Sequence, residues 1–328
     1  MSWRRNLLGL AISLACLAFI VQRIDFHGLL HALETFCWPF LIYGVLALAT
    51  GYAFRILRWA VMLRCAGASV GFSTCAAPFL GSIALNNVLP LRLGDVVRAL
   101  VFPAAIGVRK VTATSSLLME RLADLLTLLA CLALGLAASH GLQLPAWAVR
   151  LSATLAISAS VVLLLVFMFS GKLAHVLAGL AFDKHKLVAR ILGTTRELLI
   201  GFDAMSRWPI LIVLFVLSMA VWAGESGLFY CVLRGFGFTA DPAVSVVVMA
   251  IATLATLVPS SPGYVGPFHL AAFEAVSMLG GTPDQAAGIA VLSHLGVWLP
   301  TTLAGAIAIL FHPELFQGLR NRIEPVAG

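Results

Sequence analysis

The chain has 328 residues, of which 61% are hydrophobic and 11% charged, and its mean hydropathy is +1.02. Soluble domains carry about 25% charged residues, and a single soluble core cannot bury this much apolar surface. The composition therefore indicates an all-α polytopic integral membrane protein. It excludes a disordered chain, a nucleic-acid-binding protein and a large catalytic domain outside the membrane. The net charge is +7, and in a membrane protein such an excess of Lys and Arg usually lies in cytoplasmic loops.

Six apolar stretches are long enough to cross a bilayer as helices, which takes roughly 20 residues each. They cover residues 6–22, 39–59, 111–139, 146–170, 209–233 and 283–311. The Lys and Arg residues that flank them predict cytoplasmic N- and C-termini. The first stretch is expected to stay as a membrane helix, because no signal-peptidase pattern follows it. The six cysteines lie mostly in apolar runs and are expected to be free thiols.

Two other apolar stretches are divided into arms too short to span a bilayer at about 1.5 Å per residue. Residues 73–109 break at residues 88–94, and residues 242–281 break at residues 259–267. The sequence predicts a re-entrant hairpin from the cytoplasmic side in the first case and from the periplasmic side in the second. The polar residues 171–207 are interpreted as a cytoplasmic linker.

The order of these segments repeats, which predicts two inverted halves. Residues 1–140 and 141–328 each contain two helices, a hairpin and a helix. The breaks share the spacing Pro-x-x-x-Gly, at Pro90–Gly94 and Pro259–Gly263. Inverted repeats with interrupted helices are typical of transporters, and the interruptions indicate the binding site. The alternative is that Pro and Gly only kink ordinary helices.

Charged residues in the apolar segments gather around the first hairpin. A charge in hydrocarbon costs at least a few kcal/mol, so each needs a partner or a polar cavity. Five cations and three anions occur there: Arg55, Arg58, Arg92, Arg98, Arg121, Asp95, Glu120 and Asp124. Two cations lack an obvious partner, and guanidinium groups bind phosphate bidentately. This pattern predicts a pocket for an anionic lipid headgroup; the alternative is a set of structural ion pairs.

The second half is poorer in charge and offers four candidates for proton coupling: His269, Glu274, His294 and Glu225. Histidine titrates near neutral pH, which suits such a role, although a membrane histidine can also simply bond to backbone. No cysteine or histidine cluster has metal-ligand spacing. We therefore expect no metal, no cofactor and no catalytic residue.

Four segments resemble the lysylphosphatidylglycerol synthase transmembrane family, also described as having a flippase-like domain: residues 54–59, 86–99, 120–124 and 262–266. The resemblance implies a bacterial inner-membrane protein that moves lipids between leaflets. With the charge pattern, it implies a substrate-binding set of Arg55, Arg58, Asn86, Asn87, Pro90, Arg92, Gly94, Asp95, Arg98, Glu120, Arg121, Asp124, Pro262, Gly263, Gly266 and His269.

Two residues depart from the family pattern. Tyr264 replaces the middle Gly of the last motif, and His269 stands about where a Glu is usual. These departures indicate a subgroup with a different lipid. Some family members are fused to a soluble aminoacyl-lipid synthase domain. This chain is expected to have no room for that domain, so the synthase activity is not expected.

The leading functional hypothesis is a lipid flippase or transporter for an anionic or lipid-linked substrate of the phospholipid, polyprenyl-phosphate or hopanoid type. One alternative is a membrane-embedded enzyme acting on a lipid phosphate, with Ser260 or Ser261 as nucleophile. Another is a non-transporting accessory protein. The expected partners are membrane lipids with anionic headgroups and enzymes of lipid or glycan biosynthesis.

Overall fold

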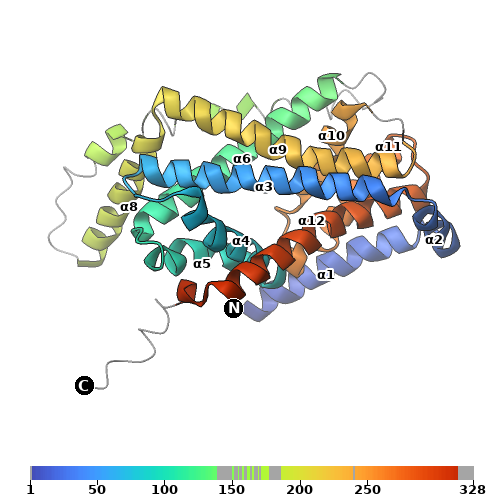
Figure 1. The fold of residues 1–328 in the computed structure, drawn as a ribbon, viewed down its shortest axis with the longest axis horizontal. Helices are drawn as coiled ribbons and strands as arrows, with labels where there is room; N and C mark the ends of the chain where they lie inside the picture. Colours follow the sequence, from blue (N-terminus) through green and yellow to red (C-terminus); the bar gives the residue numbers. More distant parts are fainter. Residues whose placement is uncertain are drawn as a thin grey trace.

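The computed structural model describes residues 2–138, 150, 154, 157–158, 161–162, 165, 169, 171–176, 186–238 and 241–316. These residues form helices and no strand (Figure 1). The α-helices and the short 3-10 turns (η) follow in this order: α1 (Ser2–Val21), α2 (Phe26–Glu34), α3 (Trp38–Cys65), α4 (Phe72–Val88), η1 (Pro90–Arg92), α5 (Leu93–Leu100), η2 (Phe102–Ala104), α6 (Lys110–Ala138), α8 (Lys186–Met205), α9 (Trp208–Gly235), α10 (Pro242–Ala255), η3 (Pro262–Tyr264), α11 (Pro267–Met278), α12 (Pro283–Phe311) and η4 (Pro313–Phe316).

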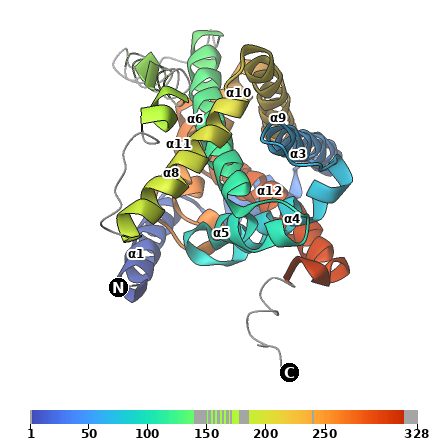
Figure 2. The same cartoon turned by 90° about the vertical axis from the view of Figure 1, so that its left-hand side faces the viewer.

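Four helices, α3, α6, α9 and α12, are long and apolar enough to cross a membrane. A fifth candidate span is the pair formed by α1 and α2, which meet at an angle of 85°. The prediction of a multi-pass helical membrane protein is therefore confirmed with four to five spans. The predicted span at residues 146–170 lies mostly outside the described residues. The polar linker predicted at 171–207 contains α8, which packs beside α6 (Figure 2).

The two stretches predicted to break do break. We name them the first broken segment (α4, η1, α5) and the second broken segment (α10, η3, α11). In each, the two arms pack against each other. The turns have the same construction, a proline followed by two residues with positive φ: Leu91 (60°) and Arg92 (54°) in η1, Gly263 (73°) and Tyr264 (60°) in η3.

This shared construction corrects the expected correspondence between the breaks. Pro90 matches Pro262, not Pro259, so that Arg92 matches Tyr264 and Gly94 matches Gly266. The Pro-x-x-x-Gly spacing is kept under the new match. Both Pro259 and Pro262 lie four residues before a glycine, so spacing alone could not separate the two alignments.

Helix pairings recur between the two halves of the chain. The contact of α4 with α12 is matched by that of α10 with α6, and the contact of α5 with α6 by that of α11 with α12. The helices α3 and α9 pack on each other along their length (Figure 1). They meet closely at glycines, because a Cβ on Gly224 would lie 2.7 Å from the Cα of Gly51. Small residues allow such close backbone approach in membranes.

The two breaks lie against each other. The turns η1 and η3 are in contact, and η3 also contacts α4. The Asn87 side chain donates to the hydroxyls of Thr301 (3.0 Å) and Thr302 (2.9 Å) on α12. Helix α1 holds the second break, since the Ser13 hydroxyl donates to the Val265 carbonyl at 2.7 Å. The fold therefore places two irregular backbone segments beside one another.

Candidate functional site

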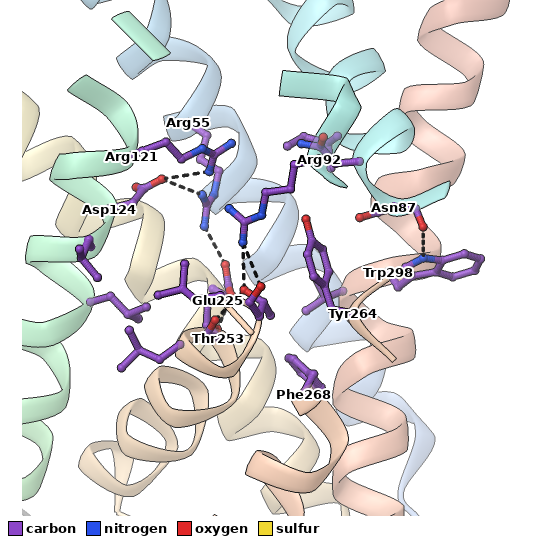
Figure 3. A pocket seen from close by; sticks show the side chains of 18 of the residues that line it. Arg55, Asn87, Arg92, Arg121, Asp124, Glu225, Thr253, Tyr264, Phe268 and Trp298 are labelled. Atoms are coloured by element: carbon purple, nitrogen blue, oxygen red, sulfur yellow. Dashed lines mark hydrogen bonds and ion pairs between the residues drawn. The ribbon is translucent and has the colours of Figure 1, made fainter. Parts of the chain in front are cut away.

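A cavity of about 360 Å³, here called the main cavity, lies where the two breaks meet (Figure 3). Its apolar lining includes Leu122, Leu125 and Leu128 of α6, Leu254 of α10 and Leu257 just after α10. The same cavity is lined by the charged and polar groups Arg55, Asn86, Asn87, Arg92, Arg121, Asp124, Glu225, Thr253, Thr256 and His294. An amphipathic molecule fits such a mixed lining, because its polar and apolar parts would each meet matching groups.

Arg55 and Asp124 form the centre of the first set of charges, which joins α3, α6 and α9 (Figure 3). Arg55 donates to Glu225 at 2.8 Å and lies 3.7 Å from Asp124. Arg58, fully buried behind it, donates to Asp124 at 2.6 Å and to the Ser218 hydroxyl at 2.7 Å. These charges are paired and hydrogen-bonded, as burial requires.

A second set of charges ties α5 to α6. Arg98 donates two hydrogen bonds to Glu120, at 2.8 and 3.1 Å, and both side chains are only 1% exposed. Arg121 donates to Asp95 at 2.8 Å, and Asp95 also accepts from the Asn86 side chain at 2.9 Å. The first broken segment is therefore anchored to its neighbour by charge-assisted hydrogen bonds.

Arg92 is the exception among these arginines. No carboxylate of the described residues lies within 4 Å of it. Its guanidinium donates to the hydroxyl (3.2 Å) and the carbonyl (3.4 Å) of Thr256 and lies 5.3 Å from the centre of the Tyr264 ring. The two sets of charges and Arg92 together have an excess of one positive charge, 5 − 4. The five arginines are Arg55, Arg58, Arg92, Arg98 and Arg121, and the four carboxylates are Asp95, Glu120, Asp124 and Glu225.

This result corrects the sequence-based estimate of two unpaired cations. Glu225, considered from the sequence only for proton coupling, approaches from α9 and pairs with Arg55. The two residues are 170 positions apart, so their contact depends on the packing of α3 on α9. Only Arg92 is left facing the main cavity without a carboxylate partner among the described residues.

The structure divides the sixteen predicted binding residues into three groups. Seven line the main cavity: Arg55, Asn86, Asn87, Arg92, Arg121, Asp124 and Gly263. Two, Pro90 and Pro262, line a neighbouring cavity instead. The remaining seven, which line neither cavity, are Arg58, Gly94, Asp95, Arg98, Glu120, Gly266 and His269.

The two glycines of this last group allow close backbone approach. A Cβ on Gly94 would collide with the Ser82 carbonyl oxygen of α4. Gly266 has φ of 104°, and a Cβ there would lie 2.6 Å from the Cα of Ser13. They shape the two breaks and do not face the main cavity.

The four candidates for proton coupling lie in different surroundings. Glu225 is in the ion pair with Arg55, and Glu274 is partly exposed and pairs with Arg23 at 3.1 Å, away from the main cavity. The His269 and His294 rings lie 4.5 Å apart, and His294 Nε2 is 2.7 Å from the Gly263 carbonyl oxygen. Of the two histidines, His294 lines the main cavity.

Five aromatic side chains also line the main cavity, and none of them was in the binding set expected from the sequence. They are Tyr52, Trp222, Tyr264, Phe268 and Trp298. Tyr52 and Trp222 lie 5.4 and 4.8 Å from the Arg55 guanidinium, at cation–π distance. Tyr52 shares a helix face with Arg55 at i, i+3, which is a signal that the sequence does contain. Trp222 and Trp298 lie on α9 and α12, far from Arg55 in the sequence, and no spacing pattern connects them to it.

The fold and site define a class, that of multi-pass helical membrane proteins with a charged and apolar cavity between two broken helical segments. The family model for the lysylphosphatidylglycerol synthase TM region matches residues 6–305, and the chain belongs to this family. The chain is 27% identical to glycosyltransferase AglD of Haloferax volcanii over 339 aligned residues. That alignment covers 91% of the chain and 53% of the relative, so the chain spans about half the relative's length. No solved structure matches significantly.

Proposed function

We propose that this protein moves an anionic or lipid-linked lipid between the leaflets of a bacterial inner membrane. The substrate class is that of phospholipids, polyprenyl phosphates and phosphorylated hopanoid-type lipids. The single observation that carries the proposal is Arg92, whose charge has no carboxylate partner among the described residues and which faces a cavity that leucines also line. A lipid phosphate would neutralise Arg92 while its chains lie along α6 and α10.

The family and the relative agree with this class of substrate. The family is named for the membrane region of a synthase whose product is a phospholipid. The relative is named a glycosyltransferase, which is why lipid-linked glycans are kept within the proposed substrate class. A phosphate group would unite this class, because arginine binds phosphate well.

The arrangement of helices supports a transport cycle. We infer six spans, two re-entrant hairpins in inverted halves and cytoplasmic termini, in line with the helix pairings that recur between the halves. In transporters with inverted repeats, one half moves against the other around a central site. The main cavity lies between the halves, since both broken segments line it. Movement of the halves would then open it to one leaflet at a time.

The serines considered as nucleophiles have structural hydrogen bonds. The Ser261 hydroxyl donates to the Val265 carbonyl at 3.2 Å and the Ser260 hydroxyl to the Ser261 carbonyl at 3.4 Å. A nucleophilic serine needs a base within hydrogen-bonding reach. Since no Asp, Glu or His hydrogen bond to either serine occurs among the described residues, the transport proposal is favoured over lipid-phosphate hydrolysis.

The proposal is tested by leaflet exchange of a fluorescent phosphatidylglycerol in liposomes, followed by dithionite quenching from outside. The key variant is Arg92→Asn, because Asn removes the charge and tolerates positive φ. We expect exchange to fall about 10- to 100-fold, since a hydrogen bond to a charged group contributes about 1.5–3 kcal/mol. Arg109→Asn is the matched control, because Arg109 is exposed and pairs with Glu197 outside the main cavity.

Equal exchange in protein-free liposomes and in liposomes with the wild-type protein would contradict the proposal. Release of phosphate or sugar from the lipid would favour the enzymatic alternative. Absence of both exchange and chemical change would favour an accessory protein. Co-purified lipid, identified by mass spectrometry, names the substrate within the proposed class.

A further inference from the structure

A groove of about 520 Å³, here called the side groove, lies between α6, α9 and α10. Its lining comes from Cys131 of α6, from α9 between Met219 and Tyr230, and from α10 between Pro242 and Met249. Ala223, in the middle of the α9 part, is exposed, so the groove opens to the outside of the helix bundle. Because α6 and α9 are candidate membrane spans, the outside at this point is lipid.

The surface of the side groove suits hydrocarbon. Among the described residues that line it, none carries a charge. The Ser245 hydroxyl donates to the Pro242 carbonyl at 2.7 Å and lies 3.1 Å from the Ser226 hydroxyl, so both serines have partners. Met219 and Met249 contribute flexible thioether side chains, which adapt to an apolar ligand of irregular shape. The groove therefore has no cation for a phosphate, unlike the main cavity.

The side groove continues the main cavity along the same three helices. Trp222 of α9 lines both spaces. On α6, Leu128 of the main cavity lies one turn before Cys131 of the groove, and on α10, Thr253 of the main cavity lies one turn after Met249. Residues three or four positions apart share a helix face. The groove thus leads from the main cavity toward the C-terminal ends of α6 and α9 and the N-terminal end of α10.

Trp222 forms the wall between the two spaces. Its ring lies 4.8 Å from the Arg55 guanidinium, and its indole N–H donates to the Thr127 hydroxyl at 2.8 Å. These two contacts fix the ring beside the charged groups of the main cavity. A headgroup in the main cavity and a hydrocarbon chain in the side groove would therefore lie on adjoining sides of this ring.

The length of the side groove matches one leaflet. The stretch of α9 from Met219 to Tyr230 is roughly 16 Å long, at about 1.5 Å per residue. Half of the hydrocarbon core of a bilayer is about 15 Å thick. One hydrocarbon chain aligned with α9 would thus reach from the main cavity to the edge of the hydrocarbon core. With the termini on the cytoplasmic side, as proposed, that edge is the periplasmic one.

We infer that the side groove binds one hydrocarbon chain of the lipid whose phosphate is held by Arg92 in the main cavity. The inference rests on the proposed function and adds to it a binding site for the apolar part of the substrate. A bilayer lipid that merely fills the groove would do so whatever its headgroup. The substrate is favoured as the occupant because the groove is continuous with the main cavity on three helices.

The test uses two photoreactive lipids, a phosphatidylglycerol and a phosphatidylcholine that carry the same diazirine-labelled acyl chain. Each is added in a small amount to phosphatidylcholine nanodiscs that contain the full-length wild-type protein, and labelled residues are mapped by mass spectrometry. The readout is the labelling by the phosphatidylglycerol divided by the labelling by the phosphatidylcholine. Val246 and Met249 report the side groove, and Leu125 reports the main cavity. Leu310, which is 76% exposed and lines neither space, reports the surrounding bilayer.

We expect the labelling ratio at Val246 and Met249 to exceed the ratio at Leu310 several-fold and to fall to the Leu310 value in Arg92→Asn. A raised ratio at Leu125 alone would overturn the site for the hydrocarbon chain and leave the proposed function standing. Ratios raised at none of these positions would overturn both. A raised groove ratio that survives Arg92→Asn would overturn the link to the phosphate. Absence of labelling by either lipid at the groove positions would show that protein covers the groove, which would also overturn the inference.

The role of the groove in transport is tested with Ala223→Phe, which places a large side chain at its opening. Leaflet exchange in liposomes should fall several-fold, and the labelling ratio at Val246 should fall to the value at Leu310. Ala49→Phe is the matched control, because Ala49 is an exposed residue of α3 that lines neither the side groove nor the main cavity. Unchanged exchange in Ala223→Phe, once its labelling ratio has fallen, would overturn the role of the groove in transport. The labelling of the wild-type protein does not depend on how this variant folds.

Discussion

Arg98 and Glu120 form a two-pronged ion pair in which both hydrogen bonds are short, 2.8 and 3.1 Å, and both side chains are 1% exposed. The pair joins α5 to α6. It lines neither cavity, although both residues belonged to the substrate-binding set expected from the sequence. Its position indicates that it holds the first broken segment in place.

We predict that Glu120→Ala destabilises the protein by about 3–5 kcal/mol, because Arg98 would keep a buried charge without its main partner. The double variant Arg98→Met with Glu120→Leu removes both charges and should recover much of this loss. Thermal unfolding in detergent, monitored by fluorescence size-exclusion, measures the difference. A double variant as unstable as Glu120→Ala would contradict this explanation.

Gly94 is predicted to be essential for the packing of α5 on α4. A Cβ there would collide with the Ser82 carbonyl and lie 2.7 Å from the Asn86 backbone nitrogen. Gly94→Ala should therefore cost about 1–3 kcal/mol of stability through overpacking. Gly71→Ala is the control, since a Cβ at Gly71 would meet no atom within 4 Å and the φ of −108° at this residue suits alanine. Equal thermal stability of the two variants would refute the prediction.

Glu225→Gln is predicted to strengthen the binding of anionic lipids. Arg55 would keep Asp124 at 3.7 Å but lose its closest carboxylate, so the charge excess would rise from one to two. One such charge roughly 10 Å from a phosphate, at an effective dielectric constant of about 20, corresponds to about a tenfold gain. Lipid binding is measured by native mass spectrometry, with Glu197→Gln outside the main cavity as control. Unchanged or weaker binding by Glu225→Gln would contradict this prediction.

Ser13 is predicted to fasten α1 to the second break. Its hydroxyl donates to the Val265 carbonyl at 2.7 Å and accepts from the Ser261 backbone N–H at 2.9 Å. Ser13→Ala removes both hydrogen bonds and should lower stability by about 1–3 kcal/mol, because two backbone groups lose their partner. Ser277→Ala is the control, since its hydroxyl bonds only within its own helix, to Phe273. Unfolding in detergent distinguishes the two, and equal losses would count against the fastening role.

The sequence by itself determined the class and the location of the breaks. Length and apolar content require a multi-pass membrane protein, because only a lipid bilayer can solvate so much apolar surface. Pro90 and the run from Pro259 to Pro267 interrupt the apolar stretches, and the structure breaks its helices there. Family membership also followed from local motifs. Each of these conclusions depends on residues that are close together in the sequence. None of them requires knowing how distant helices pack.

Only the tertiary structure decided which charges are paired. Glu225 neutralises Arg55 from 170 residues away, so Arg92 rather than any other arginine of the cluster keeps its charge uncompensated. Likewise, the repeated Pro-x-x-x-Gly spacing allowed two alignments of the breaks. The positive φ values of Arg92 and Tyr264, and the contact between these two side chains, showed that they are equivalent. Ion pairing and cavity shape depend on distances between distant helices. Composition and residue spacing do not determine those distances, because they are set only when the helices pack.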